Sequence, residues 1–355
     1  MKKINIILFG IGNVGSTLIN QIEASKTNFE SKGLIIKIPV LTNSKVALFK
    51  KEGVTKNWQN NFKTQSSSYH LDDIVDFVKK YELENLIAID VTSSIDFAYN
   101  YKTLIQNGFH IISANKTANT LDYKFYKSLR QVLNENKKQF LYETNVGAGL
   151  PIVELIKNLH NSGDEVKHIR GVFSGSLSYI FNTFSESNES FSNVLKEASQ
   201  LGFTEPDARD DLSGKDVARK LLILARELGV EKELDDITVE SLVPKQLNGT
   251  TTAEQFYNNL NILDANLGTL KANQKNEHVL RYIGELDVDN QVMKVKLIST
   301  NKNTPIGQLK HADNVFEIYS DSYSNQPLVL KGAGAGKVVT ARGVLNDVFK
   351  LANSM

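Results

Sequence analysis

The sequence contains no cysteine among its 355 residues. This absence excludes disulfide bonds, cysteine zinc sites and a thiol nucleophile. It therefore also excludes the oxidation of an aldehyde through a cysteine thiohemiacetal. A chain without disulfides fits a reducing compartment, and we expect a cytoplasmic protein.

The sequence also lacks a strong charge imbalance and a long apolar run. Its 41 basic and 40 acidic residues give a formal net charge of +1, which argues against binding nucleic acid or an acidic membrane through bulk charge. No apolar run approaches the roughly 18 residues of a membrane helix. The start, "MKKINIILFGIGNVG", resembles a signal peptide, but its short apolar run leads straight into a glycine motif. We interpret it as a β-strand.

Strand-like and helix-like segments alternate through the first 143 residues. Hydrophobic residues make up 41% of the chain, enough for one or two cores. Apolar runs predict strands at 4–9, 34–41, 85–92, 109–114 and 139–143. Helical spacing lies between them, as in 71–82 and 122–136. This alternation predicts a doubly wound parallel sheet.

After residue 151 the pattern changes. A strand is expected near 165–175, and helices then dominate to about residue 230. Residues 279–300 alternate as antiparallel strands do, and two more strands follow, at 314–320 and 327–336. The tail has an apolar helical stripe, formed by Ala341, Val344, Leu345 and Val348. We expect a second domain of α+β type with a mixed or antiparallel sheet.

A glycine motif follows the first strand. "GIGNVG" places Gly10, Gly12 and Gly15 at the G-x-G-x-x-G spacing, directly before a helix. In this motif the glycines give a tight turn, a close approach of the pyrophosphate and close helix–strand packing. The helix N-terminus adds N–H donors for phosphate. We expect a dinucleotide site here, although a plain glycine turn explains the same residues.

The end of the second strand bears on which dinucleotide binds. An acidic residue there would bind the ribose 2′-hydroxyl of NAD. The sequence instead reads "LTNSK", so Asn43, Ser44 and Lys45 offer donors and a positive charge. We expect NADP, with NAD also possible. The alternative is that Asn43 and Ser44 cap a following helix.

Other catalytic patterns are weaker. "GAGAGK" at 332–337 resembles a phosphate loop but fails the P-loop spacing, and Val338 stands where Ser or Thr is required. Tyr123 and Lys127 have the Y-x-x-x-K spacing of short-chain dehydrogenases, a short pattern that arises easily in a chain rich in Tyr and Lys. The histidines show no metal-ligand spacing.

Acidic residues crowd the stretch "GFTEPDARDDLSGKDVARK" at 202–220. One interpretation is structural: Ser213 and Asp216 form a capping box, Asp216 pairs with Lys220 one helical turn later, and Gly229 ends the helix. The other is a site. Lys220 precedes the apolar run "LLILA", and a partly buried lysine can serve as an acid or base. The residues alone leave both open.

Several motifs spread over the whole chain resemble homoserine dehydrogenases. They are the glycine motif and, in order, "SANKTA" (113–118), "ETNVGAGLP" (143–151), "FSGSLSYIFN" (173–182), the acidic stretch, and "GAGAGKVVTARGVLNDV" (332–348). The resemblance implies reversible NAD(P)-dependent oxidation of L-homoserine to L-aspartate 4-semialdehyde by direct hydride transfer, within threonine, methionine and isoleucine biosynthesis. It also implies a homodimer and two domains: a Rossmann domain of 1–146 completed by 333–355, and a catalytic and dimerisation domain of 147–332.

The resemblance also assigns roles to residues. Lys220 would be the general acid/base, with Asp216, and Lys116 would lie between nicotinamide and substrate. The residues expected to contact substrate are Glu205, Asp211, Gly175 and Ser176. Those expected to contact the cofactor are Gly10, Gly12, Asn13, Val14, Gly15, Thr92, Ser93, Lys116, Gly175 and Gly336.

A monovalent cation, sodium, is implied at "ETNVGAGLP". Its ligands would be a side-chain oxygen of Glu143 and the backbone carbonyls of Val146, Ala148 and Leu150. Hard oxygen ligands suit such an ion. From the residues alone, the segment is a glycine-rich domain hinge.

The sequence departs from the family pattern in places. Ser176 stands where many members have Thr, and Lys337 and Arg342 occupy positions that are often small. We expect no C-terminal regulatory domain and weak or absent feedback by threonine. Two rival functions remain: a dehydrogenase for another amino or hydroxy acid, and a catalytically inactive NADP-binding protein.

Overall fold

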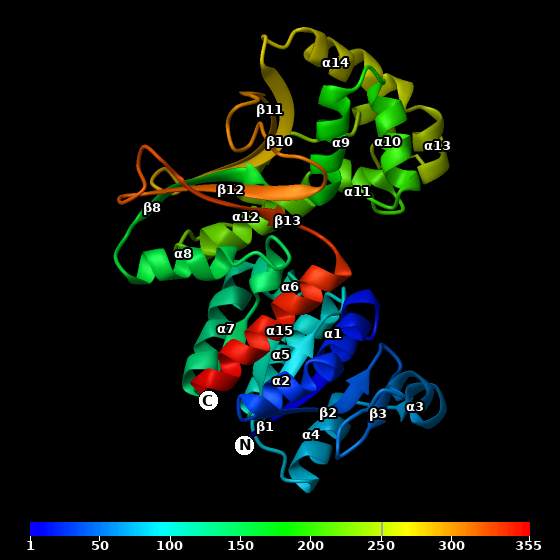
Figure 1. Ribbon diagram of the computed structural model, residues 1–355, viewed down its shortest axis with the longest axis vertical. Helices are drawn as coiled ribbons and strands as arrows, with labels where there is room; N and C mark the ends of the chain where they lie inside the picture. The colour runs from blue at the N-terminus through cyan, green and yellow to red at the C-terminus, as the bar shows by residue number, and fades with distance from the viewer. Residues whose placement is uncertain (250) are drawn as a thin grey trace. The chain divides into compact units, whose positions relative to one another are not determined.

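The computed structural model describes residues 1–249 and 251–355 (Figure 1). Contacts within the chain define two compact units. The first comprises Met1–Gly149 together with Gly336–Met355, and the second comprises Leu150–Ala335. Among the described residues, none of the helices has the length and apolar character needed to span a bilayer.

The first unit is built around a largely parallel sheet. Its elements are β1 (Lys2–Phe9), α1 (Asn13–Ala24), α2 (Lys26–Ser31), β2 (Leu34–Thr42), β3 (Val46–Phe49), α3 (Trp58–Gln65), β4 (Ser67–Ser68), α4 (Leu71–Lys80), β5 (Leu86–Asp90), η1 (Asp96–Asn100), α5 (Tyr101–Gln106), β6 (His110–Ser113), α6 (Thr117–Thr120), α7 (Tyr123–Glu135), β7 (Phe140–Leu141), η2 (Glu143–Asn145) and α15 (Lys337–Ser354).

The strand order in this sheet is β4-β3-β2-β1-β5-β6-β7. β1 pairs in parallel with β2 on one side and with β5 on the other, and β6 and β7 continue in parallel. This confirms the predicted doubly wound fold and the N-terminal strand. The pair β3 and β4, which are antiparallel to their neighbours, was not predicted.

The C-terminal helix α15 belongs to the core of this first unit. Its four predicted stripe residues are all buried, in one cluster with Ile4 and Leu8 of β1 and Leu18 of α1. Gln21 of α1 donates a hydrogen bond to the carbonyl of Val338 (2.9 Å). The first turn of α15 is therefore held beside α1 (Figure 1).

The second unit combines helices with a mixed sheet. Its elements are α8 (Ile152–Asn161), β8 (Val166–Val172), α9 (Gly175–Glu186), α10 (Phe191–Gln200), α11 (Ala208–Leu212), α12 (Lys215–Glu227), η3 (Leu234–Asp236), β9 (Thr238–Val239), η4 (Lys245–Leu247), α13 (Ala253–Asn258), α14 (Asn261–Ala272), β10 (His278–Asp287), β11 (Val292–Asn301), β12 (Asp313–Ser320) and β13 (Leu328–Ala333).

The sheet of the second unit has the order β13-β12-β8-β10-β11-β9. All its pairs are antiparallel except β11 with β9. The predicted antiparallel pair over 279–300 is confirmed as β10 and β11. Helices α9 and α12 pack on this sheet. They carry Ser176 and Lys220 respectively, so the fold brings a predicted substrate residue and the predicted general acid/base to one sheet.

Candidate functional site

The glycine loop joins β1 to α1. Gly10 adopts φ +98°, and a Cβ on Gly15 would lie 2.1 Å from the carbonyl oxygen of Gly10. Both positions therefore require glycine. A Cβ on Gly12 would meet nothing within 4 Å. Gly12 thus needs no glycine for packing within the protein, and the open space over it is where a pyrophosphate would approach.

A cleft of about 740 Å³ lies over this loop. Its lining includes Gly10, Gly12, Thr92 and Ser93, four of the predicted cofactor residues. β1 lies between β2 and β5, so the cleft is at the carboxyl edge where the strand order reverses. Open parallel sheets bind ligands at this position. Asn13 and Val14 start α1 beneath it.

Asn43 closes a turn between two strands. Its Oδ1 accepts hydrogen bonds from the backbone N–H groups of Lys45 and Val46, each at 2.8 Å, and β3 follows. The alternative that Asn43 caps a helix is therefore wrong, because no helix starts there. Asn43 and Ser44 line the cleft with Tyr69, whose hydroxyl donates to the carbonyl of Asn43 (3.2 Å).

A buried polar network, which the sequence did not reveal, supports the floor of this cleft. Asp90, 1% exposed, ends β5 and accepts hydrogen bonds from the Tyr101 hydroxyl (2.6 Å), the Asn115 amide (3.1 Å) and the Thr92 backbone N–H (2.8 Å). Burial raises the pKa of Asp90, and these hydrogen bonds oppose that rise. Asp90 thereby fixes the start of the segment that carries Thr92 and Ser93.

The same network places Lys116. Asn115 donates to the carbonyl of Ser94 (2.8 Å), and its Oδ1 accepts from the Thr117 N–H (3.0 Å). The Ser113 hydroxyl oxygen accepts a hydrogen bond from the backbone N–H of Asn115 (2.9 Å). Lys116, which is half-buried, lies between Asn115 and Thr117 in the chain and directly precedes α6. Its backbone therefore has a fixed position near the carboxyl end of β6.

The segment predicted to bind a cation forms η2 and the turn after it. Gly147 and Ala148 have φ values of +72° and +55°, an uncommon conformation for Ala. Thr144 is buried, and its Oγ1 has no hydrogen-bond partner among the described residues. Glu143, Val146 and Ala148 lie in the first unit, and Leu150 is the first residue of the second. Carboxylate and carbonyl oxygens, such as those of Glu143, Val146 and Ala148, are the kind of ligand that suits a hard cation.

In the second unit, Lys220 is 9% exposed and lies on α12. Its Nζ forms an ion pair with Asp216 Oδ2 (2.8 Å), one helical turn earlier, and donates a hydrogen bond to the carbonyl of Phe173 (2.8 Å). The Asp216 side chain is 45% exposed and that of Lys220 11%. The pair thus joins a buried amine to a carboxylate that reaches the surface.

Asp211 lies close to this pair. Its Oδ2 accepts the backbone N–H of Glu205 (2.8 Å). Burial raises the pKa of Asp211, the negative charge of Asp216 adds to that rise, and hydrogen bonds from Glu205 and the Ser176 hydroxyl oppose it. Ser176, Asp211, Asp216 and Lys220 therefore share one site. The side chain of Glu205 is exposed, and only its backbone joins them.

The two remaining predicted glycines lie in different units. Gly175 begins α9 in the second unit, where a Cβ would meet the Ala312 carbonyl at 3.1 Å. Gly336 precedes α15 in the first unit with φ +121°, a conformation that favours glycine. A close backbone contact at Gly175 and the backbone conformation at Gly336 therefore account for glycine at these positions.

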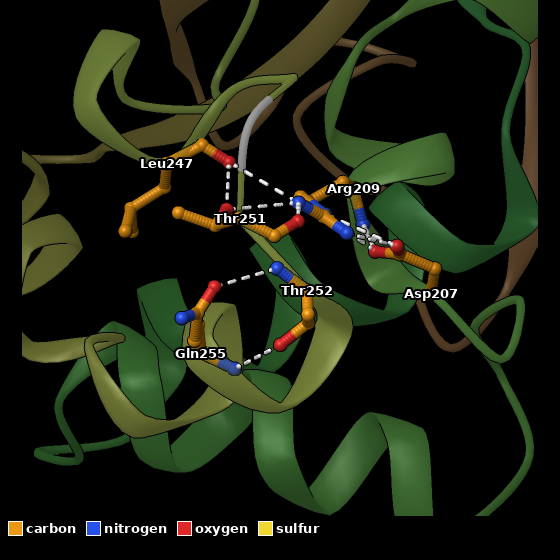
Figure 2. A network of polar contacts seen from close by, with 6 residues as sticks. All are labelled: Asp207, Arg209, Leu247, Thr251, Thr252 and Gln255. Atoms are coloured by element: carbon orange, nitrogen blue, oxygen red, sulfur yellow. Dashed lines mark hydrogen bonds and ion pairs between the residues drawn. The ribbon is translucent and has the colours of Figure 1, made fainter.

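Asp207 has a structural role, because it binds Arg209 (Figure 2). The Arg209 guanidinium donates to Asp207, to the carbonyl and hydroxyl of Thr251 (2.7 and 3.0 Å) and to the carbonyl of Leu247 (3.3 Å). It also holds the pKa of Asp207 below its usual value. Thr252 and Gln255 then form the capping box of α13. Asp207 is therefore ion-paired within the protein, whereas Asp211 forms no ion pair among the described residues.

The predicted capping box at Ser213 is wrong. The residue before α12 is Gly214, with φ +73°, and a Cβ there would lie 2.3 Å from the Tyr282 hydroxyl. Ser213 instead directly follows α11, and its hydroxyl donates a hydrogen bond to the backbone carbonyl of Asp210. The helix end is as predicted: Gly229, with φ +75°, follows the last turn. Asp216 therefore takes no part in a capping box, and its side chain pairs with Lys220.

The glycine loop over a parallel sheet and the buried lysine–aspartate pair of the second unit define a class, the nicotinamide-dependent oxidoreductases. Comparison with family models is more specific. Residues 10–143 match the model described as homoserine dehydrogenase, NAD binding domain, and residues 151–349 match the model described as homoserine dehydrogenase. The chain belongs to the homoserine dehydrogenase family.

Individual relatives agree with this assignment. A homoserine dehydrogenase of Schizosaccharomyces pombe is 35% identical over 362 residues, covering 99% of this chain and 96% of the relative. A bifunctional aspartokinase/homoserine dehydrogenase of Buchnera aphidicola is 40% identical over 351 residues, covering 98% of this chain. This chain spans only 43% of the length of that bifunctional relative.

Solved structures share the fold. A Candida auris protein of unknown function has a TM-score of 0.91 and 35% identity, with 99% of each chain covered. A hyperthermophilic archaeal homoserine dehydrogenase in complex with NADPH has a TM-score of 0.74 and 21% identity, covering 100% of this chain and 99% of that one. The latter shows likeness of fold alone.

Proposed function

We propose that this protein oxidises L-homoserine to L-aspartate 4-semialdehyde, reversibly, with NAD(P). The observation that carries the proposal is the Lys220–Asp216 ion pair, buried at its amine end and joined by Asp211 and Ser176. A reaction at an alcohol carbon needs a group that takes the hydroxyl proton. The substrate's ammonium group needs carboxylates, and Asp211 supplies one whose hydrogen bonds come from the Glu205 backbone and the Ser176 hydroxyl.

In the oxidative direction, Lys220 in its neutral amine form accepts the hydroxyl proton, and Asp216 stabilises the ammonium group that forms. In the reverse direction Lys220 returns the proton to the aldehyde oxygen. A bound nicotinamide supplies the acceptor and donor of hydride. Gly10 and Gly12 would hold its pyrophosphate, and Lys116 would lie toward the reacting carbon.

We propose NADP as the preferred cofactor. No carboxylate follows β2, and the exposed Ser44 and Lys45 offer a hydroxyl and a positive charge where the 2′-phosphate of NADP would lie. The Asn43 turn fixes the backbone of both residues. Replacing Lys45 with Ala is expected to raise the Kd for NADPH while leaving the Kd for NADH unchanged.

We also propose a sodium ion at 143–150, a homodimer formed through the second unit, and a cytoplasmic location. The Thr144 hydroxyl, which has no partner among the described residues, and the left-handed turn at Gly147 and Ala148 support the cation. Light scattering tests the dimer. Replacing sodium with choline in the assay tests the cation: turnover is expected to fall if sodium is required.

The decisive experiment is steady-state kinetics with homoserine and each cofactor, read from the absorbance of reduced nicotinamide. We expect homoserine-dependent formation of NADPH. A panel of other amino and hydroxy acids separates this function from that of a dehydrogenase with another substrate. Tight NADPH binding without turnover of any alcohol would contradict the proposal and identify a catalytically inactive binding protein.

A further inference from the structure

The carbonyl oxygen that accepts the hydrogen bond from Lys220 also accepts one from a second side chain. The Phe173 carbonyl accepts the Lys220 Nζ at 2.8 Å and the side-chain amide of Asn314 at 3.0 Å. Asn314 is 0% exposed and lies on β12. We propose that Asn314 is a positioning residue for Lys220: it fixes the Phe173 carbonyl against which the amine is held. This inference rests on the proposed role of Lys220 in proton transfer.

The sheet places Asn314 beside this carbonyl. β8 pairs with β12 so that Val172 lies opposite Val315, and Phe173 and Asn314 follow at the next position. Phe173 lies beyond the end of β8, where its carbonyl is outside the regular ladder. The Phe173 ring packs edge-on against Phe316, with ring centroids 4.9 Å apart. The side-chain amide of Asn314 supplies this carbonyl with a donor.

The orientation of the Asn314 amide follows from its partners. The reverse orientation would set Oδ1 against the Phe173 oxygen, two acceptors facing each other. In the observed orientation Oδ1 is buried and has no partner among the described residues. A buried acceptor without a partner is costly. Packing alone would be served better by an apolar side chain of the same shape, so the N–H donor explains why an asparagine occupies this position.

Gly334 makes room for this amide. A Cβ on Gly334 would lie 1.9 Å from Asn314 Cγ and 2.2 Å from its Nδ2 and Oδ1. Gly334 follows β13, directly after the residue that pairs with Asp313. This glycine of the "GAGAG" motif is thus required by the side chain that buttresses the Phe173 carbonyl. A chain of contacts runs from Gly334 through Asn314 and Phe173 to Lys220.

The principal test is a double-mutant cycle between Asn314→Leu and Lys220→Ala, measured as kcat with homoserine. Leu keeps the volume of the side chain and removes the donor. We expect N314L alone to lower kcat by about 10–100-fold, the scale of a misplaced catalytic group, with the Kd for NADPH unchanged. In the K220A background the same substitution should have almost no further effect, because there is no amine left to position.

The matched control is Asn182→Ala. Asn182 is also buried, with a partnerless Oδ1 among the described residues, but its amide donates to the His311 carbonyl at 2.8 Å, not to Phe173. Its effect on kcat should combine multiplicatively with that of K220A. If N314L likewise combines multiplicatively with K220A, Asn314 has only a structural role and the proposal is overturned.

A second test uses the close contact with Gly334. Gly334→Ala should lower kcat as N314L does, because the new methyl group displaces the amide. Combined with Asn314→Ala, which removes the amide, G334A should cost little more than N314A alone. A G334A effect of equal size in both backgrounds would contradict the proposed chain of contacts. If the unmodified protein shows no homoserine-dependent turnover, the proposed function fails instead, so the two failures are distinguishable.

Discussion

Lys220 and Asp216 form an ion pair of 2.8 Å across one turn of α12, with the amine buried and the carboxylate half-exposed. An exposed pair at this spacing would contribute only about 0.2–0.5 kcal/mol to helix stability. Here Lys220 is also hydrogen-bonded to the Phe173 carbonyl, so the amine is held from two sides. Such a fixed amine suits proton transfer at a substrate oxygen better than it suits helix stabilisation.

Replacing Lys220 with Ala is therefore expected to lower kcat for homoserine oxidation by about 10²–10⁴-fold, the range for loss of a general acid/base. The Kd for NADPH should change little, since the glycine loop lies in the other unit. Arg219→Ala, which removes an exposed cation next to Lys220 in the chain, is the control. A near-normal kcat for K220A would assign the proton transfer elsewhere, first to Lys116.

The substitution Asp211→Asn should weaken the binding of homoserine and stabilise the fold. The raised pKa of Asp211 means that its folded-state carboxylate is disfavoured by burial and by Asp216. Asn keeps an acceptor for the Glu205 N–H and removes the charge. We expect a higher KM for homoserine, and a Tm raised by about 1–4 °C at neutral pH.

The sign of the pH dependence follows from linkage. For an acid whose pKa is raised on folding, stability is lost as pH rises through the unfolded-state pKa toward the folded-state pKa. The stability advantage of D211N should therefore be present at neutral pH and vanish in acid, where Asp211 is protonated in both states. Thermal unfolding at several pH values measures it. An advantage that persists unchanged below the unfolded-state pKa would show that the charge is not its cause.

The glycine loop yields a contrast between two substitutions. Gly15→Ala puts a methyl group 2.1 Å from the Gly10 carbonyl, so both stability and cofactor binding should fall, the former by about 1–3 kcal/mol. Gly12→Ala meets nothing within 4 Å, so the fold should hold while the Kd for NADPH rises at least about tenfold.

Fluorescence titration with NADPH and thermal unfolding separate the two effects. Gly268→Ala is the control, since it lies in helix α14 of the other unit with nothing within 4 Å of its Cβ. It should leave NADPH binding unchanged. Unaltered NADPH binding by G12A would mean that the pyrophosphate does not approach Gly12.

The elements that the sequence predicted are those whose signal is local. The strand before Gly10 and the stripe from Ala341 to Val348 each show their period within a few residues. The antiparallel pair of β3 and β4 was missed because the two strands have four and two residues, too few for a pattern. The capping box at Ser213 was wrong because Gly214 precedes the helix, and the hydroxyl of Tyr282, remote in sequence, leaves no room for a Cβ there.

The site likewise has features that the sequence predicted and features that it did not. The spacing of Asp216 and Lys220 indicated their pairing, and the pairing is present. The division among the acids was not predictable, since Asp207 is neutralised by Arg209, which is anchored in turn to Thr251. The network around Asp90 joins residues from three segments of the chain, and nothing within any one segment marks it.

Tyr101→Phe tests that network. The Tyr101 hydroxyl donates to Asp90 Oδ2 at 2.6 Å and contacts Ser113 Oγ at 2.8 Å, and its side chain is 1% exposed. Without it, Asp90 loses a donor, and its pKa, already raised by burial, should rise further. We expect a loss of about 1–3 kcal/mol in unfolding free energy at neutral pH and a higher KM for the cofactor.

The loss from Y101F should shrink as pH falls, because a protonated Asp90 no longer needs the donor. Tyr99→Phe, which changes an exposed tyrosine of the neighbouring η1, is the control and should change neither quantity. Chemical denaturation across a range of pH, with cofactor KM measured in parallel, reads out both effects. A stability loss independent of pH would show that Tyr101 acts by packing alone. In that case, the segments carrying Thr92 and Lys116 would not depend on the ionised Asp90.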